Sequence, residues 1–319
     1  MPLSPRVIKT RNKIIKDNSF KLLKVFDTNK HEDNKDVVLV YDPVDKKKKV
    51  LRVGEHRTTN FLYVGYIGKK IIIPKIYKIN TDLKNKYEIE EFIPGKLICD
   101  LSGKSTATKL IPKQYFDLMI DSFWEFQKVA SSIQIPRHEV YNAKVQKHFK
   151  EAVKLMDDPN RIKRLINSQK IKKFFQDNNY PCKWKFAVDN LIITPDKKLG
   201  FIDLANVSRR FWGYDLGWIF WAVWFQLSIQ DYKQIDKHFL YLENIFKKVN
   251  VKAPKDNKID IIYVGYILIL ERIVGALYDL SANISHAQKI NKQNKKQQAF
   301  INFLNGLLNL TATKLESYI

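Results

Sequence analysis

The chain changes character at Pro94-Gly95, from a segment dominated by strand patterns to one dominated by helical patterns. Before this dipeptide, runs of β-prone residues are separated mainly by polar turns, at residues 20–26, 36–41, 49–53, 71–79 and 87–93. One helical segment, residues 58–67, is expected after the third run. This order predicts a small antiparallel sheet with one inserted helix.

The residues after Pro94-Gly95 are mainly helical in pattern. Phe116, Met119, Ile120 and Phe123 recur at the spacing of one helix face. Further helices are expected at residues 145–156, 157–178, 213–228, 232–249, 259–285 and 292–317. We therefore predict an α+β fold of two lobes: a β-rich lobe at 1–93, and a mainly helical lobe at 94–319 that carries a site hairpin within 182–216.

That hairpin is the part of the sequence with the clearest chemistry. Its strands are expected at residues 191–194 and 199–203, joined by the turn Pro195-Asp196-Lys197-Lys198. A tight hairpin returns its strand ends close together, so Asn190 and Asp203 should meet at one end. An amide and a carboxylate supply the oxygen ligands that hold Mg²⁺ against nucleotide phosphates.

The same segment resembles the aminoglycoside and choline kinase-like phosphotransferases. Their pattern is H-G-D-x-x-x-x-N, a hairpin, then G-F-I-D-L or I-D-W, then Y-D-L or Y-D-I. Here Gly200-Phe201-Ile202-Asp203-Leu204 and Tyr214-Asp215-Leu216 match in residues and spacing, and Asn190 stands at the expected distance. The resemblance implies a bilobal protein kinase-like fold, ATP or GTP as cofactor with Mg²⁺, Asn190 and Asp203 as metal ligands, and a structural Asp215.

The first half of the chain is similar to the family more loosely. Val50-Leu51-Arg52-Val53 resembles the strand whose Lys or Arg contacts nucleotide phosphates, and the guanidinium of Arg52 suits phosphate oxygens. The alternative is an ordinary strand arginine that faces solvent. Glu91, Phe92 and Ile93 lie in a segment that resembles the hinge between the lobes, whose backbone would bind adenine.

The chain departs from the family at the catalytic aspartate. Counting back from Asn190, the H-G-D triplet falls on Lys183-Trp184-Lys185, which places Lys185 at the position of the catalytic base. A lysine of ordinary pKa is a cation at neutral pH and a poor base. Its ammonium could instead take the electrostatic place of Mg²⁺. Asp189 is a second candidate base, although its side chain should point away from that of Asn190 in an extended segment.

The net charge is strongly positive, at +23. Such a charge attracts nucleic acid, an anionic membrane surface or a polyphosphate ligand, but dispersed lysines are also typical of a solvated surface. The apolar stretches 216–229 and 261–270 are shorter than the roughly 20 residues of a membrane span, and we expect buried helices there. With two cysteines in no C-x-x-C pair and no signal peptide at residues 1–18, we expect a cytoplasmic protein without a transmembrane segment.

Three functional hypotheses follow. The first is a degenerate kinase-like protein that binds a nucleotide with weak or no phosphoryl transfer and acts on a protein partner. The second is an active ATP-dependent phosphotransferase of a small hydroxylated or amino substrate, with an unusual base. The third is a basic protein that uses the same fold to bind nucleic acid or an anionic surface.

Overall fold

The computed structural model of the chain describes residues 4–26, 35–54, 65–82, 85–98, 113–131, 135, 146–177, 179–183, 186, 190–204, 207–218, 234–288 and 295–319. The residues group into two compact units. The first contains residues 1–96, 133–135 and 190–207, and the second contains 97–132, 136–189 and 208–319. The hairpin that begins at Asn190 thus groups with the amino-terminal sheet, whereas we had expected it in the helical lobe.

The first unit contains a five-stranded antiparallel sheet in the order β1-β2-β3-β7-β6. Its strands are β1 (Lys21–Val25), β2 (Asp36–Asp42), β3 (Lys47–Val53), β6 (Ile76–Asn80) and β7 (Tyr87–Glu91). The turn between β2 and β3 is stabilised by its own residues. Asp42 Oδ1 accepts the N–H of Val44 at 2.9 Å, and Lys46 adopts a positive φ. The predicted antiparallel sheet is confirmed in this unit.

The expected single strand at residues 71–79 is wrong, because Pro74 divides it. Proline has no N–H to donate to a sheet ladder, so the strand stops on either side of it. β5 (Ile71–Ile73) joins a second sheet in the order β4-β5-β11-β10-β8, while β6 stays in the first. The other strands of this second sheet include β8 (Lys96–Leu97), β10 (Leu191–Ile193) and β11 (Leu199–Phe201). Of the expected helix at 58–67, residues 58–64 lie outside the described part, and Tyr66–Ile67 form strand β4.

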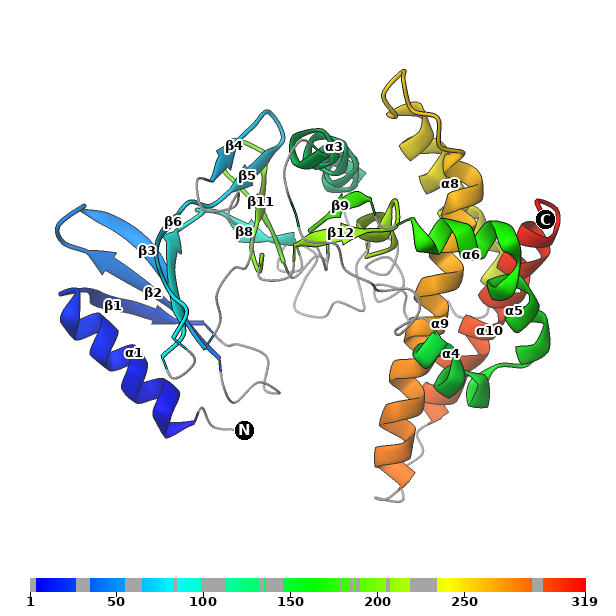
Figure 1. The fold of residues 1–319 in the computed structure, drawn as a ribbon, viewed down its shortest axis with the longest axis horizontal. Coiled ribbons are helices and arrows are strands. Elements are labelled where there is room, and N and C mark those ends of the chain that lie inside the picture. Colours follow the sequence, from blue (N-terminus) through cyan, green and yellow to red (C-terminus); the bar gives the residue numbers. More distant parts are fainter. Residues whose placement is uncertain are drawn as a thin grey trace. The chain divides into compact units, whose positions relative to one another are not determined.

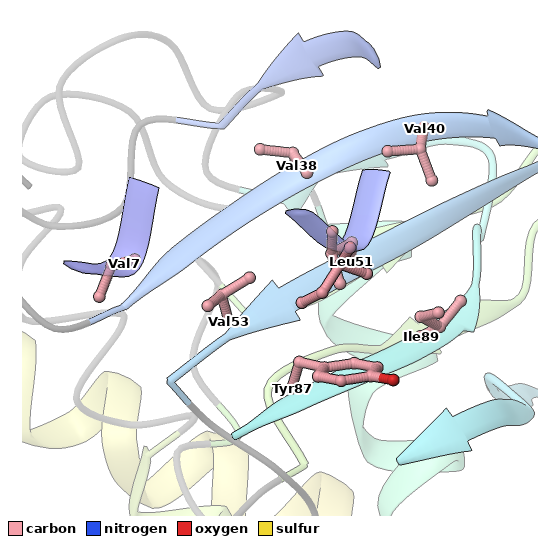
Figure 2. Close-up of a cluster of buried hydrophobic side chains, with 8 residues drawn as sticks. Val7, Val38, Val40, Leu51, Val53, Tyr87 and Ile89 are labelled. Atoms are coloured by element: carbon pink, nitrogen blue, oxygen red, sulfur yellow. The ribbon is translucent and has the colours of Figure 1, made fainter. Parts of the chain in front are cut away.

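A helix that we did not predict, α1 (Pro5–Asp17), covers one face of the first sheet (Figure 1). Ser4 caps it by accepting the N–H of Val7 at 3.4 Å, and Pro5 occupies its first turn. Val7 and Ile14 then pack on the sheet. Figure 2 shows the resulting core, which consists of Val7, Ile14, Val38, Val40, Leu51, Val53, Tyr87 and Ile89.

The second unit is mainly helical, as predicted. Among the described residues its helices include α3 (Lys113–Ser131), α4 (Gln146–Ala152), the 3-10 turn Val153–Leu155, α5 (Pro159–Asn167), α6 (Gln169–Gln176), α8 (Ile235–Val251), α9 (Ile261–Gln288) and α10 (Lys295–Glu316). The expected helix at 157–178 is interrupted at Ser168, whose ψ of 144° ends α5 and begins α6. Two short strands, β9 (Tyr180–Cys182) and β12 (Ser208–Arg210), pair antiparallel in the same unit.

Helix α9 is the centre of the helical unit and packs against α4, α8 and α10. Its segment Ile261–Ser281 is longer than the apolar stretch that we expected and is long and apolar enough to cross a bilayer. However, 83% of this apolar segment is buried inside the protein. This burial is typical of the core helix of a folded domain, in agreement with the expected buried helix.

Candidate functional site

The predicted site hairpin is present as β10 (Leu191–Ile193) and β11 (Leu199–Phe201). The strands pair antiparallel, with Leu191 opposite Phe201 and Ile193 opposite Leu199. Thr194 closes the turn, since its N–H donates to Lys198 O at 3.0 Å and its Oγ1 accepts the N–H of Lys198 at 2.9 Å. These local contacts fix the register, and therefore fix which residues follow at the open end.

Asn190 and Asp203 meet at that open end. The N–H of Ile202 donates to Asn190 O at 3.2 Å, which continues the ladder one step beyond the strands. Asn190 Nδ2 then donates to Asp203 Oδ2 at 3.4 Å. The side chain of Asn190 is buried, so the pair lies in a partly desolvated position. The structure therefore brings together the two residues that the hairpin predicted as neighbours.

Asp203 has an unusual backbone conformation. Its φ is +57°, in the left-handed region, although it is not a glycine. Such conformations cost roughly 1–3 kcal/mol for most residues, less for Asp and Asn, and are frequent at functional sites. The chain turns at Asp203, shortly after the end of β11. The residue with this unusual backbone conformation is therefore also the residue that the sequence predicts as a metal ligand.

Arg52 lies on the sheet face opposite the core. Strand alternation places Leu51 and Val53 under α1 and Arg52 on the other side. There Arg52 Nε lies 2.6 Å from Glu90 Oε1 on β7, and only 12% of the arginine side chain is exposed. Burial opposes the charge, but Glu90, Asp203 and Glu88 outweigh it and raise the pKa of Arg52. Arg52 is therefore not a solvent-facing strand arginine.

Glu88 and Glu90 were missed by sequence reasoning. The signal was the alternation Tyr87-Glu88-Ile89-Glu90, which puts both glutamates on one face of a strand. Ile89 opposite Leu51 belongs to the core, so the glutamates must face the other side, where Arg52 lies. Two buried carboxylates in a strand are unusual enough to predict a buried cation nearby.

The expected hinge residues begin with Glu91, the last residue of β7. The N–H of Glu91 donates to Lys75 O at 2.8 Å, so that donor is already used within the sheet. Phe92 and Ile93 lie beyond the strand, and Ile93 is buried. Any backbone donor to an adenine would therefore come from Phe92 or Ile93 and not from Glu91.

Two glycines let the hinge lie directly on the site hairpin. A Cβ on Gly200 would come 2.7 Å from Ile93 Cγ2, and a Cβ on Gly95 would come 2.2 Å from Ile193 O. Gly95 also has a φ of +147°, which other residues rarely adopt. The hinge and the hairpin that carries Asn190 and Asp203 are consequently packed at backbone distance.

In the helical unit, Asp215 anchors the segment that leads toward Lys185. It is 1% exposed and accepts the N–H of Lys183 at 2.6 Å and the Cys182 thiol at 3.2 Å. Burial raises the pKa of Asp215, and the hydrogen bond from Lys183 opposes this rise. Lys185 and Asp189 themselves lie outside the described residues.

The residues present fit a magnesium ion that is held mainly by a nucleotide. Asp203 offers carboxylate oxygens and Asn190 an amide oxygen, and Mg²⁺ is commonly bound by one or two such side chains plus phosphates and water. Among the described residues, no group of three or more His, Cys, Asp or Glu side chains could hold a metal alone. The donor set thus suits a phosphate-bound ion better than a structural metal centre.

Comparison with known proteins places the fold. No protein-family model matches the sequence, and no curated protein matches it. The choline kinase LicA from Streptococcus pneumoniae is similar in structure, with a TM-score of 0.51 and 11% identity over 97% of this chain and 100% of that chain.

Two further solved structures are similar to the same degree. LicA in complex with AMP has a TM-score of 0.50 and 11% identity, over 94% of this chain and 98% of that chain. An aminoglycoside phosphotransferase from Alicyclobacillus acidocaldarius has a TM-score of 0.51 and 10% identity over 93% of both chains. The chain therefore has the protein kinase-like fold of these phosphotransferases, which confirms the fold implied by the sequence resemblance.

Proposed function

We propose that this chain is a degenerate kinase-like protein that binds ATP or GTP and transfers a phosphoryl group weakly or not at all. The observation that carries the proposal is the contact between Asn190 and Asp203 at the end of a closed hairpin. The similarity to LicA, one structure of which contains AMP, supports a nucleotide as the ligand. Lys185, at the position of the catalytic base, supports weak or absent transfer.

Each residue has a proposed role in nucleotide binding. Asn190 and Asp203 would hold Mg²⁺, which neutralises phosphate charge when it is bound. The backbone of Phe92 and Ile93 would bind the base. Arg52 would present its remaining guanidinium N–H groups to phosphate, because Glu90 uses Nε. The lobe at residues 1–93 is thus the proposed nucleotide-binding lobe, in a cytoplasmic protein.

Lys185 is the residue that would limit the rate of phosphoryl transfer. A positioned general base contributes about 10² to 10⁴ in rate, and an ammonium cannot accept the proton of a substrate hydroxyl. Its positive charge near the phosphates would instead support nucleotide binding without a metal. The degenerate protein would then act through a protein partner rather than through a product.

An active phosphotransferase is the second candidate. It is favoured by the pairing of Asn190 with Asp203, since a protein that only binds partners needs neither ligand. In that case Asp189 or a neutral Lys185 would accept the proton, and the substrate would be a small hydroxylated or amino compound. Release of ADP that depends on one such substrate would separate this candidate from the first.

A thermal-shift titration with ATP and GTP, each with and without Mg²⁺, tests the proposal. A nucleotide at about 100 times its dissociation constant stabilises the folded state by about 2.7 kcal/mol. Stabilisation that requires Mg²⁺ would support metal binding by Asn190 and Asp203. Stabilisation without metal would support the ammonium of Lys185 in its place. No stabilisation under any condition would overturn nucleotide binding.

A further inference from the structure

The helix that covers the first sheet has a basic outer face. At 100° per residue, Lys9, Lys13 and Lys16 lie on the side of α1 roughly opposite Val7 and Ile14, which are buried on the sheet. All three lysines are exposed. None of them takes part in an ion pair among the described residues, whereas Arg11, nearer the sheet, pairs with Asp36 at 3.0 Å.

The strand that follows α1 adds exposed apolar side chains to this surface. The chain reverses at Ser19 and enters β1, the edge strand of the sheet. Leu22 is opposite Val40, and Val25 is opposite Val38, so both lie on the face that α1 covers. They are not covered fully, since they remain 40% and 46% exposed. Figure 1 shows α1 and β1 next to each other in this unit.

We propose that α1 and β1 form a docking surface for an anionic lipid bilayer, made of Lys9, Lys13, Lys16, Leu22 and Val25. Charge complementarity selects an anionic partner, because the exposed side of the helix carries lysines at the spacing of one face. The adjacent leucine and valine select lipid over nucleic acid, since aliphatic side chains enter the acyl boundary of a bilayer. Bases stack on aromatic rings, and the large exposed hydrophobic residues of α1 and β1 in the described structure are all aliphatic.

The lysines of β1 alone would not support this proposal. Lysines on an edge strand also protect a sheet from pairing with another chain, and Lys21 and Lys24 serve that purpose wherever they face. The α1 lysines have no such role, because the helix is not an edge. The surface is also separate from the nucleotide residues, since Arg52 and Glu90 lie on the opposite face of the same sheet.

The test is co-sedimentation of the full chain with phosphatidylcholine vesicles, with and without phosphatidylserine. We expect binding only to the anionic vesicles, and loss of that binding as NaCl rises from about 0.1 M to about 1 M, which shortens the Debye length from about 10 Å to about 3 Å. Each lysine near an anionic surface contributes about fivefold in affinity, so K9Q/K13Q/K16Q should lose on the order of 100-fold.

A matched variant separates this surface from net charge. K237Q/K247Q/K248Q removes the same charge from exposed positions of α8 and should bind almost as tightly as the wild type. L22S/V25S should weaken binding while leaving its salt dependence unchanged. Circular dichroism and thermal unfolding confirm that each variant is folded.

Three outcomes would overturn the proposal. One is equal binding to neutral and anionic vesicles, and another is an equal loss in the α1 and α8 triple variants. The third is binding of a duplex DNA that K9Q/K13Q/K16Q weakens while the anionic vesicles do not bind, which would assign the surface to nucleic acid.

Discussion

Arg52 on β3 donates its Nε hydrogen to Glu90 on β7 over 2.6 Å, within the sheet itself. The two residues are diagonal neighbours on adjacent strands, because Arg52 is directly opposite Glu88. The pair is therefore set by strand register and is present before any ligand arrives. A guanidinium held in this way has its other N–H groups oriented by the same contact, which would suit the proposed contact with phosphate.

The effects of removing Arg52 and Glu90 on stability should not be additive. Glu90→Leu leaves the buried Arg52 guanidinium without its partner and should cost about 3 to 5 kcal/mol. Arg52→Met combined with Glu90→Leu should cost clearly less than the sum of the single changes. Chemical unfolding of the four proteins in a double-mutant cycle measures the coupling, and additive single effects would contradict it.

Asp203→Asn should abolish any stabilisation by nucleotide that depends on Mg²⁺. The substitution removes the charged oxygen ligand but retains size and polarity. Asp196→Asn in the exposed turn of the same hairpin is the matched control and should leave the nucleotide response unchanged. Thermal shifts with ATP and Mg²⁺ provide the measurement, and an equal response in both variants would rule out Asp203 as a ligand.

Lys185→Asp should raise Mg²⁺-dependent nucleotide binding. The change removes an ammonium that would compete with the metal and supplies a carboxylate in its place. Calorimetric titration with ATP and Mg²⁺ measures the affinity. Lys172→Asp on the exposed side of α6 carries the same charge change and should have no effect. Unchanged or weaker binding in Lys185→Asp would show that Lys185 is not near the phosphates.

Gly95→Ala should destabilise the first unit by about 2 to 4 kcal/mol, because it combines an overpacked contact with a strained φ. The added Cβ would lie 2.2 Å from Ile193 O, so the hinge would have to move off the hairpin. Gly275→Ala on α9 is the control, since its nearest neighbours would be 3.9 Å away and alanine favours a helix. Equal thermal stability of the two variants would disprove the close contact.

Ionisation of Tyr214 should lower the stability of the folded protein at high pH. Burial raises the pKa of Tyr214 to about 12, while Arg272 opposes this rise. A raised pKa in the folded state means that the stability is fully present below the unfolded value near 10 and is lost as the pH rises toward 12. Between about pH 10 and pH 11 this loss is on the order of 1 kcal/mol.

The Tyr214→Phe variant should lack that loss. Urea unfolding of both proteins at about pH 9 and about pH 11 gives the comparison, because all other ionisable groups are shared. The wild type should lose more stability than the variant over this interval. An identical decrease in the two proteins would mean that Tyr214 ionises at its ordinary pKa.

The local part of the candidate site could be predicted from the sequence. The hairpin is closed by contacts between Thr194 and Lys198, only four residues apart, and these fix the register that joins Asn190 to Asp203. Helical periodicity likewise predicted the helical unit. Such features depend on hydrogen bonds and side-chain spacings that a short segment contains in full.

Helix α1 was missed for a physical reason. Its lysines and polar residues resemble a solvated segment, and its signals were Ser4-Pro5 as a start and Val7 with Ile14 on one face. Those two residues stabilise the helix only when a sheet is present to bury them. The sequence contains the pattern, but the packing on Val38, Leu51 and Tyr87 decides that it folds.

The partner of Arg52 depended entirely on tertiary structure. Its strand was evident, and the sequence placed an arginine there, but Glu90 lies 38 residues further along the chain. In the strand order β1-β2-β3-β7-β6, the strand beside β3 is β7. That order results from the burial of one shared core. The sequence thus predicted most strands of the first sheet and the site hairpin. Only the folded sheet decided which charges meet, because contacts between distant residues depend on closing the whole sheet at once.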